Sequence, residues 1–534
     1  MVKALLTIVM LTLFFASMLG VGLYCRKHST NVDGFVLGGR SVGPWLTAFA
    51  FGTSYFSAVI FVGYAGQFGW EFGLASTWIG LGNAFIGSLL PWVILGRRTR
   101  VMTQHLGSKT MPDFFGKRYQ SNTLKIIASV IVFVFLIPYT ASLYNGLSSL
   151  FNSAFNIPYW IVIVVMAVLT GIYVIFGGYM ATAINDFIQG IIMLAGIVAV
   201  IAAVLVDNGG FMEAYRGLSL VENESAALTG AYSSFLGPNP VFLFFVVVLT
   251  SLGTWGLPQM VGKFYSIDSE DSIKKGTIIS TIFAIVVAGG CYFLGGFGRL
   301  YANNSAIWAN GEIGTKLLKD NIVPTMLSNL NPVIVAIVIV LVLSASMSTL
   351  SSLVLTSSST LTLDVIVPMF KKGNKKLSEG KKLVILRLFV LFFVVISAII
   401  AIVKDSFPGA TFIAQMMGVS WGALAGAFLA PFLYGLYWKG VTKSAVVVSF
   451  VFGTGVEIIQ LIKDLCGLAF PEGILSFVFT NSLYSGVFAM VGGLVLVPAV
   501  SLITKKQDKT DVDKMFECYN RKVTVDAKQN LGSK

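Results

Sequence analysis

Long apolar segments separated by short polar ones run through the whole chain. A helix needs roughly 20 apolar residues to cross a hydrocarbon core of about 30 Å, and thirteen segments meet this criterion. They lie at residues 4–24, 44–66, 73–97, 124–151, 158–180, 185–206, 240–262, 273–300, 333–360, 384–403, 410–437, 442–463 and 475–503. The pattern predicts an all-α polytopic membrane protein with about 13 transmembrane helices.

The positive charges predict how these helices are oriented. Of the 37 Lys and Arg residues, 30 fall in loops on one side of the membrane if the N-terminus lies outside the cell. Lys263 is counted among them, because the seventh apolar segment ends at residue 262. Cytoplasmic loops carry an excess of Lys and Arg, so the distribution predicts an N-out, C-in topology with a basic cytoplasmic tail at 504–534.

Two of the apolar segments contain a helix-breaking stretch at corresponding positions. With an N-out topology, helices two to six and seven to eleven form two sets of five with opposite orientation. The second helix is interrupted by Phe-Gly-Thr-Ser-Tyr at 51–55 and the seventh by Gly-Thr-Trp-Gly-Leu-Pro at 253–258. Freed backbone is tolerated inside a bilayer only where it lines a cavity, and paired broken helices in an inverted repeat point to the binding site of a transporter.

The ninth apolar segment, 333–360, carries a run of hydroxyl side chains where lipid would favour none. On a helix, Ala345, Ser348 and Thr349 stand at i, i+3 and i+4, so one carbonyl and two hydroxyls can converge on one face. Uncharged oxygens that converge inside a membrane suit a weakly held hard cation such as Na⁺. The competing interpretation is helix packing, in which Ser and Thr allow close approach and bond to the preceding turn.

Asp186 is the clearest acidic residue at membrane depth, near the predicted cytoplasmic start of the sixth helix. An ionisable residue inside a membrane indicates function by default, although an acid at a helix N-terminus also stabilises the helix dipole. Ser351 and Ser352 lie about 4–6 Å further toward the cytoplasm than Ser348, at 1.5 Å per residue. Asp186 is therefore predicted either to share a second cation with these two hydroxyls or to guide the first cation out.

Composition and motifs exclude several classes of function. With 56% hydrophobic and 11% charged residues, the chain lacks the polar surface of a soluble protein of 534 residues. The net charge of +13 follows from the loops and indicates orientation rather than a nucleic-acid partner. The four cysteines are scattered, and the sequence contains no nucleotide-binding or hydrolase motif. The chain is therefore predicted not to be an enzyme.

Four stretches of the sequence resemble motifs of the sodium:solute symporter family. They are residues 35–44 (FVLGGRSVGP), the stretch around Asp186, residues 345–352 (ASMSTLSS) and residues 432–442 (FLYGLYWKGVT). The resemblance spans nearly the whole chain and implies a LeuT-type fold of five plus five inverted repeats. It implies one transporter domain at 1–503, with a leading helix at 4–24, inverted repeats at about 44–206 and 240–437, and trailing helices at 442–463 and 475–503.

The resemblance also implies which residues bind sodium. In this family the conserved sodium site combines two carbonyls at the break of the second helix with a carbonyl and two hydroxyls of the ninth. The corresponding residues here are Thr53, Phe56, Ala345, Ser348 and Thr349. Some members, notably the sialic acid carriers, have a second sodium site. Its side chains correspond here to Asp186, Ser351 and Ser352.

For the solute, the resemblance implies a cavity beside the two breaks. Proline carriers of the family have an acid in the break of the second helix where this chain has Tyr55, which argues against proline. Residues 53–63 look closer to pantothenate-type and monocarboxylate-type members. The positions predicted to line the cavity are Tyr55, Ser57, Tyr139, Trp255, Gln259 and Gln415. Packing inside the bundle is the alternative for each of them.

Together these features predict a secondary active transporter in the plasma membrane. It would couple inward movement of Na⁺ to uptake of a small polar organic solute, either pantothenate-like, monocarboxylate-like, an amino acid or a sialic acid. Its partners would be the sodium ion, the solute and membrane lipid. The alternatives are a proton-coupled symporter or exchanger on the same fold, with Asp186 as the titrating group, and a membrane sensor that binds solute without transporting it.

Overall fold

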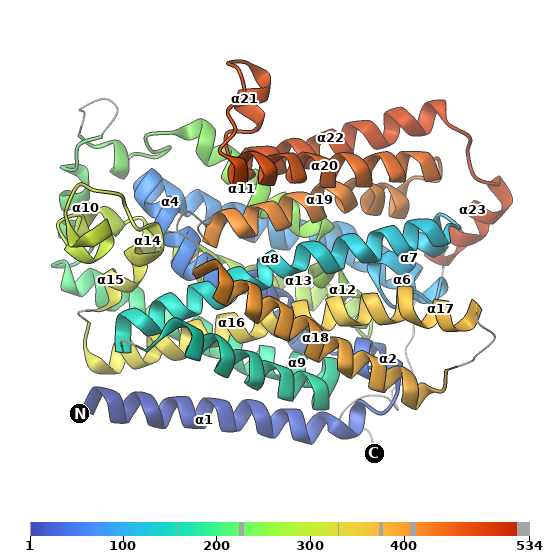
Figure 1. The fold of residues 1–534 in the computed structure, drawn as a ribbon, viewed down its shortest axis with the longest axis horizontal. Coiled ribbons are helices and arrows are strands. Elements are labelled where there is room, and N and C mark those ends of the chain that lie inside the picture. The colour runs from blue at the N-terminus through green and yellow to red at the C-terminus, as the bar shows by residue number, and fades with distance from the viewer. Residues whose placement is uncertain are drawn as a thin grey trace.

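Helices make up the architecture of the computed structural model, which describes residues 2–155, 157–223, 229–328, 330–372, 377–405 and 413–520. Within this part of the chain the β-pairing consists of three isolated bridges. The long helices lie side by side along the longest axis, with α1 (Val2–Cys25) at one edge and α20 (Lys443–Cys466) and α22 (Ser482–Ile503) at the opposite edge (Figure 1). Residues 521–534 of the predicted tail lie outside the described residues.

The bundle combines long helices with shorter, interrupted ones. The other long helices are α8 (Asn122–Phe155), α9 (Tyr159–Asp207), α16 (Pro332–Thr360), α18 (Glu379–Asp405) and α19 (Ile413–Tyr437). The shorter ones include α3 (Pro44–Tyr55), α4 (Ala65–Phe72), α5 (Thr77–Ala84), α11 (Pro240–Leu252), α12 (Pro258–Ser266), α13 (Glu270–Ala284) and α14 (Gly290–Gly295). Short helices at the ends of the bundle are α2 (Val32–Leu37), α6 (Arg97–His105), α7 (Met111–Arg118), α10 (Phe211–Ser219), α15 (Ile322–Ser328), α17 (Val367–Lys372), α21 (Ile474–Val478) and α23 (Lys509–Phe516).

Ten stretches of the described chain are long and apolar enough to cross a membrane, and the bent pair α11 and α12 makes eleven. The sequence predicted thirteen spans. The two numbers differ because some helices continue past the predicted boundaries of a span. Helix α9 has 49 residues and contains two predicted spans, 158–180 and 185–206. A straight helix of that length would measure about 74 Å, more than twice the hydrocarbon core. Gly178 interrupts it with φ 55° and ψ −150°, a backbone conformation that glycine adopts without steric penalty.

The second predicted helix is broken, but directly after the stretch that the sequence suggested. Helix α3 continues through the glycine at residue 52 and ends at Tyr55, and Phe56 leaves the helix with φ −97° and ψ 88°. Gly52 serves close packing instead of a break, since a Cβ there would lie 2.4 Å from the Phe283 ring. The predicted interruption at 51–55 is therefore wrong in position, and the break falls at residues 56–57.

The seventh predicted helix is broken where the sequence placed the interruption. Helix α11 ends at Leu252, residues 253–256 form a 3₁₀ turn, and Leu257 is extended with φ −83° and ψ 120°. The residue before a proline is pushed toward extended backbone by the proline ring, which explains why the change occurs directly before Pro258. The two helical parts are bent by 46° relative to each other.

Segments predicted on opposite sides of the membrane lie at opposite ends of the bundle. Helices α2, α6, α7, α17 and α23 gather at one end, and α10 and α15 lie at the other (Figure 1). At the first end, Arg118 Nη1 donates to Gln507 Oε1 at 3.0 Å, and Lys439 Nζ lies 2.6 Å from Asp513 Oδ1. This grouping agrees with the loops that the positive charges assign to one side. We call it the predicted cytoplasmic end.

Glycines bring α4 and α14 into backbone contact. A Cβ on Gly69 would lie 1.9 Å from the Gly295 carbonyl oxygen, and one on Gly295 would lie 2.0 Å from the Ala65 carbonyl oxygen. Small residues allow this close approach of helices in membranes. We expect Gly69→Ala to lower the free energy of unfolding by about 3 kcal/mol or more. The added methyl group would meet backbone atoms of Gly295, which cannot move aside as a flexible side chain could.

The thermal stability of the purified protein checks this expectation, with Gly171→Ala as the matched control. A Cβ on Gly171 meets no atom within 4 Å, although the residue is also buried in a helix. If both variants melt at the wild-type temperature, the backbone contact between α4 and α14 does not limit stability.

Candidate functional site

Four oxygen atoms converge where the end of α3 crosses the middle of α16. Ser348 Oγ lies 3.0 Å from the Thr53 carbonyl oxygen, and Thr349 Oγ1 lies 3.1 Å from the same oxygen. Both hydroxyls also lie 3.1 Å from the Ala345 carbonyl oxygen. All four residues are buried. The structure therefore brings together the three residues of the ninth predicted helix with the broken second helix.

The local sequence explains why these oxygens are available. The last carbonyls of a helix have no intrahelical partner, and Thr53 is two residues from the end of α3, so its carbonyl oxygen can accept bonds from another helix. The i, i+3, i+4 spacing places Ala345, Ser348 and Thr349 on one face of α16. Phe56 has left the helix, and it lines a small cavity together with Ala345.

The crossing is suited to a monovalent hard cation. All its oxygens are uncharged, and hydroxyls can turn their lone pairs from donating to neighbouring carbonyls toward an ion. The negative end of the α3 dipole points to the same place. Uncharged oxygen ligands hold such an ion weakly, which is the requirement for an ion that must also leave.

Other hydroxyls of α16 follow the packing interpretation. Ser344 Oγ donates to the Val340 carbonyl oxygen at 2.7 Å, and Ser346 Oγ donates to the Val342 carbonyl oxygen at 2.8 Å. These bonds stay within one helix, as serine commonly does in helix interiors. The interhelical bonds of Ser348 and Thr349 distinguish the candidate site from these two serines.

A second polar cluster lies one helical turn further along α16, and it contains a lysine. Lys263 Nζ lies 3.5 Å from Asp186 Oδ2 and donates to Ser352 Oγ at 2.9 Å. Ser352 Oγ lies 2.7 Å from Ser54 Oγ, whereas Ser351 Oγ donates to the Ser348 carbonyl oxygen at 2.9 Å. Asp186 is fully buried and Lys263 is 4% exposed. The assignment of Lys263 to a cytoplasmic loop is therefore wrong.

A cavity connects this cluster with the predicted cytoplasmic end. Its lining runs from Lys109, just before α7, and Met111, the first residue of α7, to Lys263 and Ser352. Tyr179 and the final turns of α16 form its walls. The cavity gives the buried ion pair a path toward the end of the bundle where the predicted cytoplasmic loops gather.

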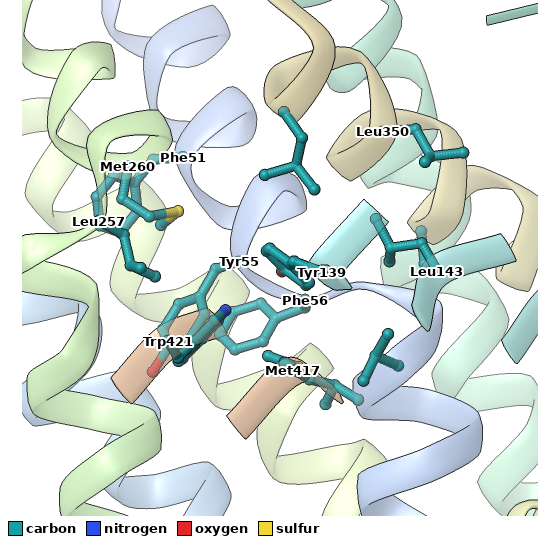
Figure 2. Close-up of a cluster of buried hydrophobic side chains, with 14 of the residues drawn as sticks. Phe51, Tyr55, Phe56, Tyr139, Leu143, Leu257, Met260, Leu350, Met417 and Trp421 are labelled. Carbon is teal, nitrogen blue, oxygen red and sulfur yellow. The ribbon is translucent and has the colours of Figure 1, made fainter. Parts of the chain in front are cut away.

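Aromatic side chains fill the space beside the break of α3. Tyr55 stacks on Phe56 with ring centroids 4.3 Å apart and lies 5.9 Å from the Trp421 ring, and Tyr139 meets Trp421 edge-on at 6.0 Å (Figure 2). The Tyr139 hydroxyl faces the Ser57 hydroxyl and the Trp421 indole N–H without reaching hydrogen-bond geometry. Three buried polar groups thus converge inside an aromatic cluster and leave their hydrogen-bonding capacity unused.

The structure unites only half of the predicted solute-cavity residues. Tyr55, Ser57 and Tyr139 belong to the aromatic cluster, and the Tyr55 hydroxyl donates to the Thr250 carbonyl oxygen at 2.5 Å. Trp255 donates its indole N–H to the Ile86 carbonyl oxygen at 2.9 Å. Trp255 makes no ring contact with Tyr55, Tyr139 or Trp421, and the other two residues also lie outside the cluster. Gln259 lines the cavity beside Lys263, and the backbone carbonyl of Gln415 accepts a bond from Ser482 at 3.3 Å.

Two residues of these clusters were missed by the sequence interpretation. Lys263 carries a usable signal, because it is a single cation within Met-Val-Gly-Lys-Phe-Tyr at the end of an apolar segment. A charge in that setting is expected to find a buried partner. Trp421 carries no such signal, since an aromatic residue inside an apolar helix is equally suited to core packing.

The sequence of this chain matches known proteins over most of its length. The model of the family described as "Sodium:solute symporter family" matches residues 35–453. The osmoregulated proline transporter OpuE of Bacillus subtilis (strain 168) is 27% identical over 94% of this chain and 96% of its own length. The sodium/proline symporter of Staphylococcus aureus (strain JH9) is 29% identical over 97% of this chain and 97% of its own length.

A solved structure extends the likeness to three dimensions. A Na⁺-coupled sialic acid symporter, in a substrate-bound outward-open state, superposes with a TM-score of 0.72 over 94% of this chain and 99% of that chain, at 16% sequence identity. Likeness at this identity shows that the fold is shared, which is the LeuT-type arrangement expected from the sequence. With its candidate spans, the protein is a multi-pass integral membrane protein of the cell membrane. The chain belongs to the sodium:solute symporter family.

Proposed function

We propose that this protein takes up a small organic solute into the cell together with Na⁺, and that Na⁺ binds at the crossing of α3 and α16. Its ligands are the carbonyl oxygens of Thr53, Phe56 and Ala345 and the hydroxyls of Ser348 and Thr349. The observation that carries the proposal is the approach of both hydroxyls to the Thr53 carbonyl, at 3.0 and 3.1 Å, across two different helices.

The same helix break links the ion to the solute. Thr53 faces the crossing, whereas Tyr55, two residues later, belongs to the aromatic cluster. An ion that draws the end of α3 toward α16 therefore also positions the aromatic rings beside the break. By thermodynamic linkage, sodium raises the affinity for solute by the same factor by which solute raises the affinity for sodium.

The direction of transport follows from the proposed N-out, C-in topology. An inside-negative potential of 100 mV supplies about 2.3 kcal/mol for each positive charge that moves inward. Sodium released from the crossing passes the Asp186 and Lys263 pair and reaches the cavity lined by Lys109 and Met111. This cavity is the inner exit in our proposal.

The aromatic cluster favours a solute that carries a carboxylate. Ser57, Tyr139 and Trp421 offer three buried donors, which are unused by the protein and suit an acceptor-only group. Amino acids are the first candidates, because the two relatives named above transport proline, and short monocarboxylates, pantothenate and sialic acid share the carboxylate. At Tyr55, where the family's proline carriers have an acid, the hydroxyl is already bonded to Thr250, which argues against proline itself.

We expect the true solute to stabilise the purified protein in Na⁺ and to have little effect when choline replaces Na⁺. A ligand at 100 times its dissociation constant adds about 2.7 kcal/mol to stability. Thermal unfolding in each salt, measured with amino acids, monocarboxylates, pantothenate and sialic acid in turn, identifies the solute. Its uptake into vesicles should then collapse in choline, and a decarboxylated analogue should compete poorly.

Three outcomes would contradict the proposal in different ways. Uptake that persists in choline and follows a pH gradient would establish the proton-coupled alternative. Sodium-dependent solute binding to reconstituted protein, with no uptake, would establish a sensor. Stabilisation by an uncharged solute alone would show that the carboxylate is not recognised.

A further inference from the structure

The three side chains predicted to share a second sodium ion are already engaged by the protein. Asp186 pairs with Lys263, at 3.5 Å between Oδ2 and Nζ, and Ser352 accepts a bond from the same ammonium at 2.9 Å. Ser351 is turned away, with its hydroxyl on the Ser348 carbonyl oxygen at 2.9 Å. The set that would surround an ion instead surrounds the end of a lysine side chain.

The lysine is held from several directions. Its ammonium also lies 5.5 Å from the centre of the Tyr179 ring, within the range of a cation–π contact. Ser352 is fixed in turn by Ser54 on α3, at 2.7 Å. Helix α12 carries Lys263 into this position, because the break before Pro258 bends it by 46° from α11. The contacts of Lys263 therefore involve four helices, which are α3, α9, α12 and α16.

An ammonium and a sodium ion are chemically similar occupants. Both carry one positive charge, and a lysine ammonium is a compact point charge that binds carboxylate and hydroxyl oxygens through three donors. Two such cations on one buried carboxylate repel each other strongly where the surroundings are apolar. The ammonium, 3.5 Å from Oδ2, already neutralises the carboxylate, and neither Asp186 oxygen has a hydrogen-bond partner. The charge of the ammonium, not a lack of oxygens, therefore excludes a second ion.

We propose that Lys263 fills the second cation position as a tethered cation, so that the transporter binds one sodium ion, at the crossing of α3 and α16. This inference rests on the proposed function, because that function assigns sodium to the crossing. It identifies Lys263 as a residue that determines the number of coupled ions. The lysine supplies, as part of the chain, the positive charge that a second exchangeable sodium ion would otherwise bring. Removing the ammonium should create the second sodium site that the wild-type chain lacks.

The test is the number of sodium ions bound by each purified variant, measured by equilibrium binding of ²²Na⁺. We expect one ion per chain for the wild type and two for Lys263→Met, because Asp186 and Ser352 become free. Lys263→Arg keeps the charge and should bind one. The double variant Lys263→Met/Asp186→Asn loses the carboxylate and should also bind one. Lys274→Met, an exposed lysine paired with Asp271 on the next helix, is the matched control and should bind one.

Each outcome of this experiment either supports or overturns the inference. Two ions in the wild type, or one ion in Lys263→Met that elutes as a folded protein, overturns the inference while leaving sodium coupling intact. If Lys263→Met cannot be purified, the wild-type count decides alone. Absence of sodium binding in the wild type, with or without the stabilising solute, overturns the proposed function and this inference with it. If the variant Ser348→Ala/Thr349→Ala no longer binds the single wild-type sodium ion, that ion lies at the crossing. If this variant still binds the ion, the ion lies elsewhere, and both the proposed function and this inference are overturned.

Discussion

The double variant Ser348→Ala/Thr349→Ala is expected to require a sodium concentration about a hundredfold higher than the wild type for half-maximal solute uptake. Two of the proposed ligands are hydroxyls that contact the Thr53 carbonyl oxygen at 3.0 and 3.1 Å. Bonds between a polar group and an ion contribute about 1.5 kcal/mol or more each, and about 1.4 kcal/mol corresponds to a tenfold change in affinity. Uptake measured as a function of sodium concentration gives the value.

The control for this variant is Ser344→Ala/Ser346→Ala on the same helix. These serines are equally buried, but their hydroxyls bond to carbonyls of α16 itself. The control should keep the wild-type sodium dependence. If both pairs shift it equally, the hydroxyls act through helix stability and the crossing is not the sodium site.

The variant Asp186→Ala is expected to lose about 3–5 kcal/mol of stability and to reach the membrane in much smaller amounts. It leaves the Lys263 ammonium buried without its anion, and breaking one side of a buried ion pair is strongly destabilising. Adding Lys263→Met should restore much of the loss, because the double variant contains no unpaired charge. Thermal unfolding of the wild type, the two single variants and the double variant forms a double-mutant cycle, which measures the coupling free energy between Asp186 and Lys263.

A surface ion pair provides the comparison for this cycle. Asp271 and Lys274 lie 3.6 Å apart, nearly the same separation as the buried pair, but both side chains are at least 80% exposed. Exposed pairs contribute little, so Asp271→Ala should leave the melting temperature unchanged. Asp186→Ala with wild-type stability would mean that water reaches Lys263 in the folded protein and replaces the carboxylate.

The two cation positions differ in how firmly they hold charge. The crossing of α3 and α16 offers uncharged oxygens, so an ion can enter and leave with each transport cycle. The neighbouring position pairs a carboxylate with a covalently attached ammonium, and neither partner can leave. The proposed cycle therefore uses one exchangeable sodium ion and one permanent cation, a single turn of α16 apart.

The membrane class and the face of uncharged oxygens on the ninth apolar segment were accessible from the sequence. A helix in lipid must satisfy its own backbone, so apolar length alone identifies spans. The spacing of Ala345, Ser348 and Thr349 is local, and helical geometry places them on one face wherever the helix lies. The break before Pro258 was equally local, because proline restricts the residue that precedes it.

Contacts between distant segments could not be derived in this way. Gly52 resembles a break in the sequence, yet it lies inside α3 because Phe283 occupies the space where a side chain would stand. Gln259 and Tyr55 both lie at helix breaks, but Gln259 lines the cavity beside Lys263, whereas Tyr55 packs against Trp421 in the aromatic cluster. Trp421 entered the aromatic cluster only through the packing of α19 against α3 and α8.

The sequence by itself determined that this is a polytopic membrane protein with a face of uncharged oxygens in its ninth apolar segment, because both properties depend on neighbours along one helix. The tertiary structure shows that this face meets the Thr53 carbonyl, which the family resemblance had implied, and it alone decided that Lys263 leaves the predicted loop to pair with Asp186. A lysine 77 residues from its carboxylate in the chain is placed by the bend between α11 and α12 and by the cost of burying either charge alone.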